Sequence, residues 1–370
     1  MNEGLERHGA EASGRLRPGE SISSAAAAPG EDAKVAGSVL SIDPAIVYTS
    51  LGTSPVRSID AFEPRLRAGR AAILVYMAGH LGGGSFAKLS IAFLRHYRRT
   101  HPQHEVHFLC NAPDEVETFA RHGEPALLLN HNLGVSETIF TPLPDRQVGF
   151  DAIYIASLSA GKRMELAAAI DRVAYVTYLP TDPSGETRAL LAHLGGLAPA
   201  HLILNPLRDG VPVALKAAEV NEACNSAAVG LCLSAVEGAM LASIEYLLAG
   251  LPIVTTPSVG GRDLFFDSEY CLTVPPDARR VREAVEALRR RGIPRQYIRE
   301  RTLAKMEPQR RAFLELLDGI LERQGSAPRF RGPWPWPHRR NLCGCRSVSQ
   351  HFARARLERT SGCVDQTRSV

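Results

Sequence analysis

Two glutamates, Glu237 and Glu245, are the residues of this chain best spaced to hold a polar ligand between them. Glu237 follows a strand-like apolar run, and Glu245 falls in a segment of helical period, roughly 9 Å along the axis from a helix start near residue 239. The free N–H groups of a first helical turn bind anions. The spacing therefore predicts a nucleotide-sugar, with its sugar near Glu237, its ribose at Glu245 and its phosphates on the amides of Gly238, Ala239 and Met240.

Two cations supply the charge that such a ligand needs. Lys162 and Arg163 follow a predicted strand over residues 150–156 and precede a predicted helix. The dipole of a helix disfavours cations at its start, whereas the carboxyl ends of strands in an open α/β sheet are where anionic ligands bind. This favours a phosphate-binding role over two solvated cations, above all for Lys162.

A glycine loop is the third candidate element. Gly82 and Gly83 lie between a predicted strand, residues 71–78, and a helix that Ser85 can cap. Strand, glycine loop and helix form a phosphate cradle in many α/β folds, and we assign Gly82 and Gly83 to donor binding. Glycines are also needed simply to turn tightly from a strand into a helix, so this loop alone is weak evidence.

The elements that must position these residues alternate between strand and helix. The apolar runs predict strands over 71–78, 105–110, 125–130, 150–156, 173–179, 201–205, 228–233 and 251–255. Helical periods fall over 85–99, 114–122, 164–171, 184–194, 217–225, 239–249, 279–291 and 299–321. Alternation of this kind predicts an α/β fold with parallel sheets covered by helices.

Composition divides the 370 residues into four parts. Residues 1–45 have few large apolar side chains and are expected to be disordered. Residues 46–145 form a reduced N-terminal domain on the acceptor side, and the proline-rich segment 140–144 links it to a nucleotide-sugar-binding domain over 146–325. Residues 326–370 read as a basic, disordered tail.

Charge and composition limit the functional classes. The net charge is +4, but residues 329–370 hold nine arginines against two acidic residues, so the rest of the chain is slightly acidic and nothing in it predicts binding to nucleic acid. No apolar run is long enough to cross a membrane, and no signal peptide opens the chain, which favours a cytoplasmic protein. Peripheral contact with a membrane stays open. The seven cysteines are expected to be reduced.

A metal site is not expected. Four histidines lie close together in the sequence, His96, His101, His104 and His107, but no pattern of carboxylates or cysteines accompanies them. The Cys343-x-Cys345 pair in the tail has no defensible ligand spacing. We therefore predict no metal and no cofactor beyond the donor substrate.

At this point the chain resembles the GT-B-fold retaining glycosyltransferases of family 4, also called group 1, over about residues 70–320. The likeness lies in the glutamate pair, in Lys162, in the Gly82 loop followed by His104-Glu105-Val106, and in the segments Ala249-Gly250-Leu251-Pro252-Ile253-Val254 and Gly260-Gly261. The glutamate pair and its Gly-x-Pro strand are the specific part.

The resemblance implies two Rossmann-type domains and hexosyl transfer from a nucleotide-diphosphate-sugar to an acceptor, with retention at the anomeric carbon. Lys162, Arg163 and the helix start would stabilise the charge on the leaving diphosphate. Glu237 would orient the sugar and stabilise positive charge on its ring, and Glu245 would bind the ribose. We assign Glu237, Lys162 and Arg163 to catalysis. The acceptor is open among glycans, lipids and small molecules.

The sequence departs from the family pattern in three places, and two of them, the missing arginine and the short first domain, motivate an alternative. Ser157 stands where members commonly have an arginine, Glu-Gly-Ala-Met replaces the usual Glu-Gly-Phe-Gly, and the first domain spans only about 75 residues from Ala71 to Asp145. The alternative is a non-catalytic nucleotide-sugar-binding or regulatory protein. His131 is a candidate sugar contact by its position after a strand. A nicotinamide-dependent oxidoreductase ranks lower, because the glycine loop lacks Gly-x-Gly-x-x-Gly phasing.

Overall fold

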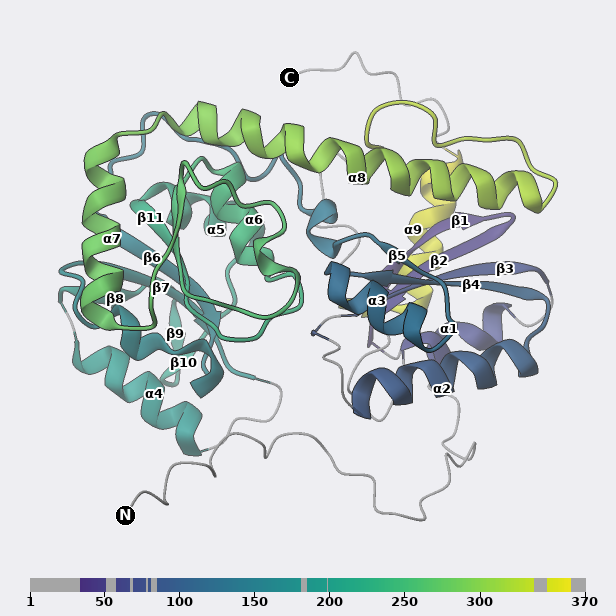
Figure 1. Cartoon of the computed structure of the whole chain (residues 1–370), viewed down its shortest axis with the longest axis horizontal. Helices are drawn as coiled ribbons and strands as arrows, with labels where there is room; N and C mark the ends of the chain where they lie inside the picture. The colour runs from purple at the N-terminus through teal and green to yellow at the C-terminus, as the bar shows by residue number, and fades with distance from the viewer. Residues whose placement is uncertain are drawn as a thin grey trace.

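The computed structural model describes residues 34–50, 58–66, 69–77, 79–80, 85–180, 185–197, 199–335 and 345–360. The predicted phosphate loop, with Gly82 and Gly83, lies outside the described residues. So does most of the predicted disordered N-terminal segment. Within the described part, two six-stranded sheets lie side by side (Figure 1).

The first sheet has the strand order β14-β1-β2-β3-β4-β5. Strands β2 to β5 are parallel, and β1 is antiparallel to both β2 and β14. The strands are β1 (Lys34–Ile42), β2 (Ala45–Ser50), β3 (Ala71–Tyr76), β4 (His104–Cys110), β5 (Ala126–Leu128) and β14 (Cys345–Ser347). The helices of this domain are α1 (Ser58–Leu66), α2 (Ser85–Thr100), α3 (Pro113–Arg121) and α9 (Val348–Thr360).

Both ends of the described chain contradict the expectation of disorder. Residues 34–42 form β1, and residues 345–360 form β14 and α9. With β2, which was also not predicted, they give the first sheet six strands where the sequence predicted three. Helix α9 packs on β1, and Val348 and Phe352 join Val35, Val39 and Phe62 in one buried cluster. Each segment alone carries too few large apolar residues to predict order. Together they bury enough apolar surface to be ordered.

The second sheet is entirely parallel, in the order β13-β12-β11-β6-β7-β8. Its strands are β6 (Phe150–Ser157), β7 (Val173–Tyr178), β8 (His201–Ile203), β11 (Ala227–Cys232), β12 (Ile253–Thr255) and β13 (Cys271–Thr273). Its helices are α4 (Gly185–Gly196), α5 (Ala217–Asn225), α6 (Leu241–Leu248) and α7 (Ala278–Arg291). A short hairpin, β9 (Leu207–Arg208) and β10 (Val211–Pro212), follows β8.

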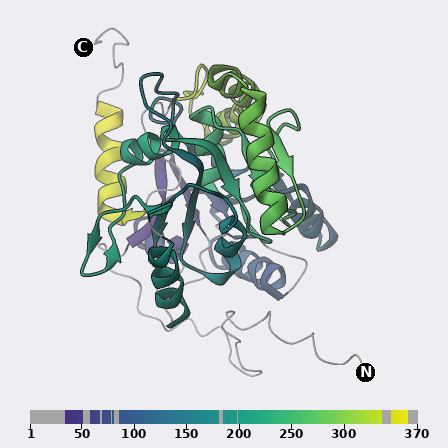
Figure 2. The same ribbon diagram turned by 90° about the vertical axis from the view of Figure 1, so that its left-hand side faces the viewer.

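Helix α8 (Arg295–Arg323) joins the two domains, since it runs along the top of both in Figure 1. The ring of Phe313 on α8 lies edge-on to Tyr48 of β2, with 5.9 Å between ring centroids, and Tyr48 stacks on Tyr76 of β3. The same buried cluster continues to Ile153 of β6 and Ile244 of α6. The perpendicular view places α9 and α7 on opposite sides of the molecule (Figure 2). The domains therefore share one continuous apolar core.

No helix among the described residues combines the length and apolar character that crossing a membrane requires.

Asp267 fastens α8 to the second domain and gives a pH-dependent prediction. Its carboxylate accepts hydrogen bonds from Arg301, at 2.9 Å, and from the backbone N–H of Glu269, and it pairs with Lys305. Chiefly because of the Arg301 hydrogen bond, the pKa of Asp267 is lowered from 3.8 to about 2. A lowered pKa in the folded state contributes stability that is present above pH 3.8 and is lost as the pH falls toward 2.

We expect Asp267→Asn to lower the free energy of unfolding at pH 7 by about 1 to 2 kcal/mol, because charge-assisted hydrogen bonds to a partly exposed carboxylate are lost. The difference from the wild type should shrink as the pH falls from about 4 toward 2. Urea unfolding of both proteins across this range measures it. A difference that does not depend on pH contradicts the assignment.

Candidate functional site

The candidate site lies at the carboxyl edge of the second sheet. Strands β6, β11 and β12 are neighbours and run parallel, so the loops that follow them emerge at the same edge. These loops carry Lys162, Glu237 and Thr256, respectively. This is the edge at which open α/β sheets bind ligands.

The structure brings Lys162 and Glu237 together. The Lys162 ammonium donates a hydrogen bond to Oε1 of Glu237, and the Ser234 hydroxyl donates to the same oxygen at 2.6 Å. The Lys162 and Glu237 side chains are 20% and 13% exposed, so the pair is half-buried but open to solvent. Two groups predicted from segments 75 residues apart thus form one ion pair that a charged ligand can reach.

The Arg163 side chain binds other groups of the protein, at the ends of two strands. Its Nε donates to the Leu233 carbonyl at 2.6 Å, and one Nη donates to the Thr256 hydroxyl at 2.7 Å. Its backbone is left-handed, with φ 49°, and burial lowers the pKa of its guanidinium. In this conformation Arg163 ties together the ends of β11 and β12, and the donors that it uses there are not directed at a ligand beside Lys162.

The segment Gly238, Ala239 and Met240 forms the turn into α6. The helix begins at Leu241, two residues later than predicted, because Met240 takes a left-handed conformation with φ 49°. Gly238 and Ala239 are buried. Their carbonyls accept hydrogen bonds from the Gly261 amide and the Asn132 side chain, at 2.7 and 2.6 Å. The helix start is therefore covered by the first domain and by the turn after β12.

Glu245 lies inside α6 with no exposed surface. The structure therefore does not place its carboxylate on the surface that Lys162 and Glu237 share. A ribose would reach Glu245 only after a rearrangement of the residues that bury it.

Asparagine side chains of the first domain contact this edge. The sequence analysis did not predict this contact. The Asn130 side chain donates to the carbonyls of Asn111 and Gly261, at 3.0 and 2.8 Å. A Cβ atom at Gly261 would lie 2.2 Å from the Asn111 carbonyl oxygen, so only glycine fits. The contact could have been predicted, because Asn130 ends one predicted strand and Asn111 directly follows another. The carboxyl ends of parallel strands meet at one edge of the sheet.

Arg262 also was not predicted as part of the site. Its side chain binds the backbone of the loops that carry the site. The side chain is fully buried and donates to the carbonyls of Cys232, Ser234 and Thr256 at 2.7 to 3.0 Å. Burial is the largest influence and opposes its charge, but the hydrogen bond to Asp263 and the attraction of Cys232, Asp263 and Glu237 together outweigh it, so the pKa of Arg262 is raised. The charged arginine thus fixes the backbone that leads to Glu237.

Two histidines of the first domain lie near this boundary. His80 sits between the carboxylates of Asp114 and Glu115, at 3.4 and 3.2 Å, and the Glu115 hydrogen bond raises its pKa. Its Cβ lies near Gly260. His131, the candidate sugar contact, is buried, and burial lowers its pKa to about 4. His131 is therefore neutral and away from solvent.

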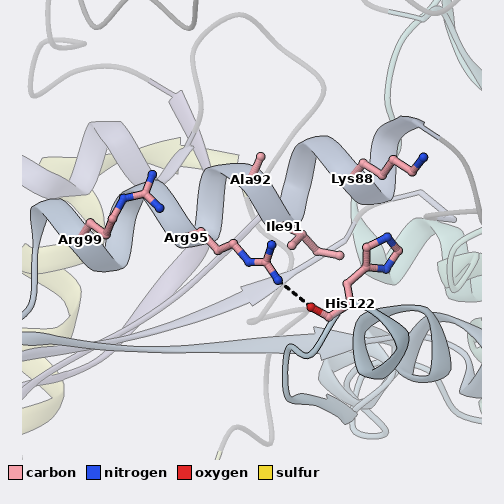
Figure 3. A pocket seen from close by; sticks show the side chains of 6 residues that line it. All are labelled: Lys88, Ile91, Ala92, Arg95, Arg99 and His122. Carbon is pink, nitrogen blue, oxygen red and sulfur yellow. Dashed lines mark hydrogen bonds between the residues drawn. The ribbon is translucent and has the colours of Figure 1, made fainter.

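Other features of the described residues lie apart from this edge. No group of three or more His, Cys, Asp or Glu side chains within them could hold a metal ion. A pocket of about 350 Å³ lies on the outer face of the first domain between α2 and the end of α3. Lys88, Arg95 and Arg99 from α2 and His122 line it (Figure 3). Arg95 is held there by the His122 carbonyl, at 2.6 Å.

No protein-family model matches this sequence, and no curated protein does either. By structure the chain is similar to sucrose-phosphate synthase from Thermosynechococcus elongatus, with a TM-score of 0.51 and 14% identity over 72% of this chain and 76% of that one. It is also similar to HepE of Anabaena in complex with UDP, with a TM-score of 0.50 and 12% identity over 70% and 74% of the two chains. A further HepE structure, with UDP and glucose, gives the same values. At these identities the likeness establishes the fold, and the chain has the predicted GT-B-like architecture.

Proposed function

We propose that this protein transfers a glycosyl group from a nucleotide-diphosphate-sugar to an acceptor, with retention of the anomeric configuration. The observation that carries the proposal is the Lys162–Glu237 pair at the carboxyl edge of the second sheet. At this edge of a GT-B-like fold, a cation suited to a diphosphate lies next to a carboxylate suited to a sugar. HepE, which has a similar fold, was solved with UDP, so UDP is the first ligand to test.

The pair suggests how donor binding and chemistry are connected. Without a ligand, the charge of Lys162 is balanced by Glu237. A diphosphate offers Lys162 a second anion, and a Lys162 ammonium that turns to the phosphates leaves Glu237 to orient the sugar hydroxyls. Glu237 then also stabilises the positive charge that develops on the sugar ring. Ser234, which donates to Glu237, holds the carboxylate in place during this exchange.

In the reaction, the bond between the anomeric carbon and the diphosphate oxygen breaks. The acceptor oxygen bonds to the same face of that carbon, and its proton passes to the leaving phosphate. Lys162 stabilises the charge that builds on the diphosphate. Arg163 positions the strand ends beneath the site, because its guanidinium already binds Leu233 and Thr256.

The remaining predicted contacts belong to the same proposal. The amides of residues 238–240 would receive the phosphates once the turn at Gly260 and Gly261 moves aside. The predicted ribose contact at Glu245 would require a rearrangement of the residues that bury this side chain. Gly82 and Gly83 would approach the donor from the first domain. The acceptor would bind between this domain and Glu237.

The test begins with calorimetric titration of the full chain with UDP, GDP, ADP and NAD. Binding of one nucleoside diphosphate well above NAD is expected. The proposal is overturned if none of the three nucleoside diphosphates binds, or if NAD binds more tightly than they do. Incubation of the matching nucleotide-sugars with panels of glycan, lipid and small-molecule acceptors then measures transfer. NMR of the product gives the anomeric configuration. A donor that binds but is never transferred points to a regulatory protein instead.

A further inference from the structure

Tyr178 is an exposed aromatic residue at the edge that carries the candidate site. It is the last residue of β7 and is 51% exposed, while the rest of that strand is buried. Among the residues whose exposure is described, Tyr297 on α8 is the other exposed aromatic side chain, at 36%. A single exposed ring is ordinary on a protein surface, but a ring that adjoins further exposed apolar side chains at the carboxyl edge of a parallel sheet is a candidate ligand contact.

The backbone fixes Tyr178 to the loop that carries Lys162. Tyr178 pairs in register with Ser157 at the end of β6. The Leu158 amide donates to the Tyr178 carbonyl at 3.0 Å, and the Lys162 amide donates to the Ser159 carbonyl at 3.0 Å. Leu158 is thus held to Tyr178 by a hydrogen bond between strands, Lys162 follows four residues later through one hydrogen-bonded turn, and the two side chains start from neighbouring strand ends.

Alternation along β7 shows which side of the sheet Tyr178 faces. Ala174 and Val176 belong to the buried cluster that includes Ile244 and Leu247 of α6, whereas Tyr175 belongs to the cluster on the opposite face. Side chains two residues apart share a face of a strand. Tyr178 therefore continues the row on the α6 side, the side of the helix whose start was predicted to bind phosphates.

The hairpin β9–β10 adds exposed apolar surface next to Tyr178. Leu207, Val211 and Val213 are 56%, 41% and 39% exposed. The hairpin is anchored beside β7, because the Asn205 side chain accepts a hydrogen bond from the Thr177 amide at 2.7 Å. An aromatic ring and aliphatic side chains thus lie at one end of the edge, and the loop that carries Lys162 starts from the neighbouring strand β6.

We infer that Tyr178 is the stacking platform for the nucleobase of the donor. The inference rests on the proposed function, and it assigns the base to the end of β7, the diphosphate to Lys162 after β6 and the sugar to Glu237 after β11. The ribose, which joins the base to the diphosphate, then lies between β7 and β6, and this placement replaces the predicted ribose contact at the buried Glu245. These three strands are adjacent in the sheet, so the span from β7 to β11 is two strand spacings, roughly 10 Å. A nucleobase combines a π face with polar edges, which suits a tyrosine beside an apolar hairpin.

The experiment compares Tyr178→Ala with three matched proteins: the wild type, Tyr178→Phe and Tyr297→Ala. Each is titrated with UDP, GDP, ADP and inorganic pyrophosphate, and circular dichroism checks that each is folded. Tyr178→Ala is expected to weaken the binding of the preferred nucleoside diphosphate roughly 10-fold or more, which is the effect of removing one aromatic stacking partner. Pyrophosphate affinity should not change. Tyr178→Phe and Tyr297→Ala should bind as the wild type does.

The outcomes separate this inference from the function on which it rests. If the wild type binds a nucleoside diphosphate and Tyr178→Ala binds it equally well, the stacking role is wrong and the proposed function stands. Equal weakening of pyrophosphate and nucleotide also overturns the inference, since Tyr178 would then act by holding the Lys162 loop. If the wild type binds no nucleoside diphosphate, the proposed function fails first.

Discussion

Lys162→Met is expected to weaken the binding of the preferred nucleoside diphosphate by about 30-fold or more, because a charge-assisted contact to a phosphate is lost. The change keeps an unbranched side chain, one heavy atom shorter, and removes the charge. Glu237 loses its partner, so its carboxylate also repels the incoming diphosphate. Isothermal titration with UDP, GDP and ADP measures the loss, and thermal unfolding shows whether the variant is folded.

Two control variants sharpen this result. Lys88→Met removes an equivalent charge from α2, on the outer face of the first domain (Figure 3), and should leave nucleotide affinity unchanged. Glu237→Gln frees Lys162 from its counter-ion, so nucleoside diphosphates should bind at least as tightly as in the wild type while transfer is lost. Equal affinity in Lys162→Met and the wild type would refute the assignment of the phosphate site.

Arg262→Leu is expected to lower the free energy of unfolding by about 3 to 5 kcal/mol, the usual effect of removing one partner from a buried charged network. Leucine fills part of the volume but leaves the carbonyls of Cys232, Ser234 and Thr256 without their buried donor. These carbonyls lie at the ends of β11 and β12. The loop carrying Glu237 should therefore lose its support, and nucleotide binding should weaken with stability.

Urea unfolding of Arg262→Leu measures this effect. The matched control is Arg290→Leu on α7, where the arginine side chain is 72% exposed and pairs only with Glu286. That variant should change the free energy of unfolding by less than about 0.5 kcal/mol. If Arg262→Leu and Arg290→Leu unfold alike, Arg262 is not the support that its contacts indicate.

The local pattern of the sequence was sufficient to predict most individual elements. Residues 217–225 were predicted as a helix and form α5 with the same bounds, and α7 starts one residue before its predicted range. Strands β3, β4, β6 and β7 fall within one or two residues of their predicted ends. These segments carry a full apolar stripe or a buried apolar run of their own, so no distant partner is needed to recognise them.

The elements that sequence reasoning missed depend on distant partners. Strand β1 pairs with β14, more than 300 residues away in the chain, and α9 carries buried Val348 and Phe352 in an otherwise basic sequence. The weak local pattern of each segment predicts disorder. Their order comes from apolar surface that is buried only when both ends of the chain meet on one sheet edge.

The apolar runs of the sequence are enough to predict that Lys162 and Glu237 both follow parallel strands, and parallel strands present their carboxyl ends at one edge. Strand periodicity is a local property, so this juxtaposition could be predicted. The other features become visible only in the folded chain: Glu245 is buried, Arg163 binds two strand ends, and Asn130 and Arg262 hold the loops of the site in place. Which face of a helix is covered, and which carbonyl a long side chain reaches, depend on packing between segments far apart in the chain.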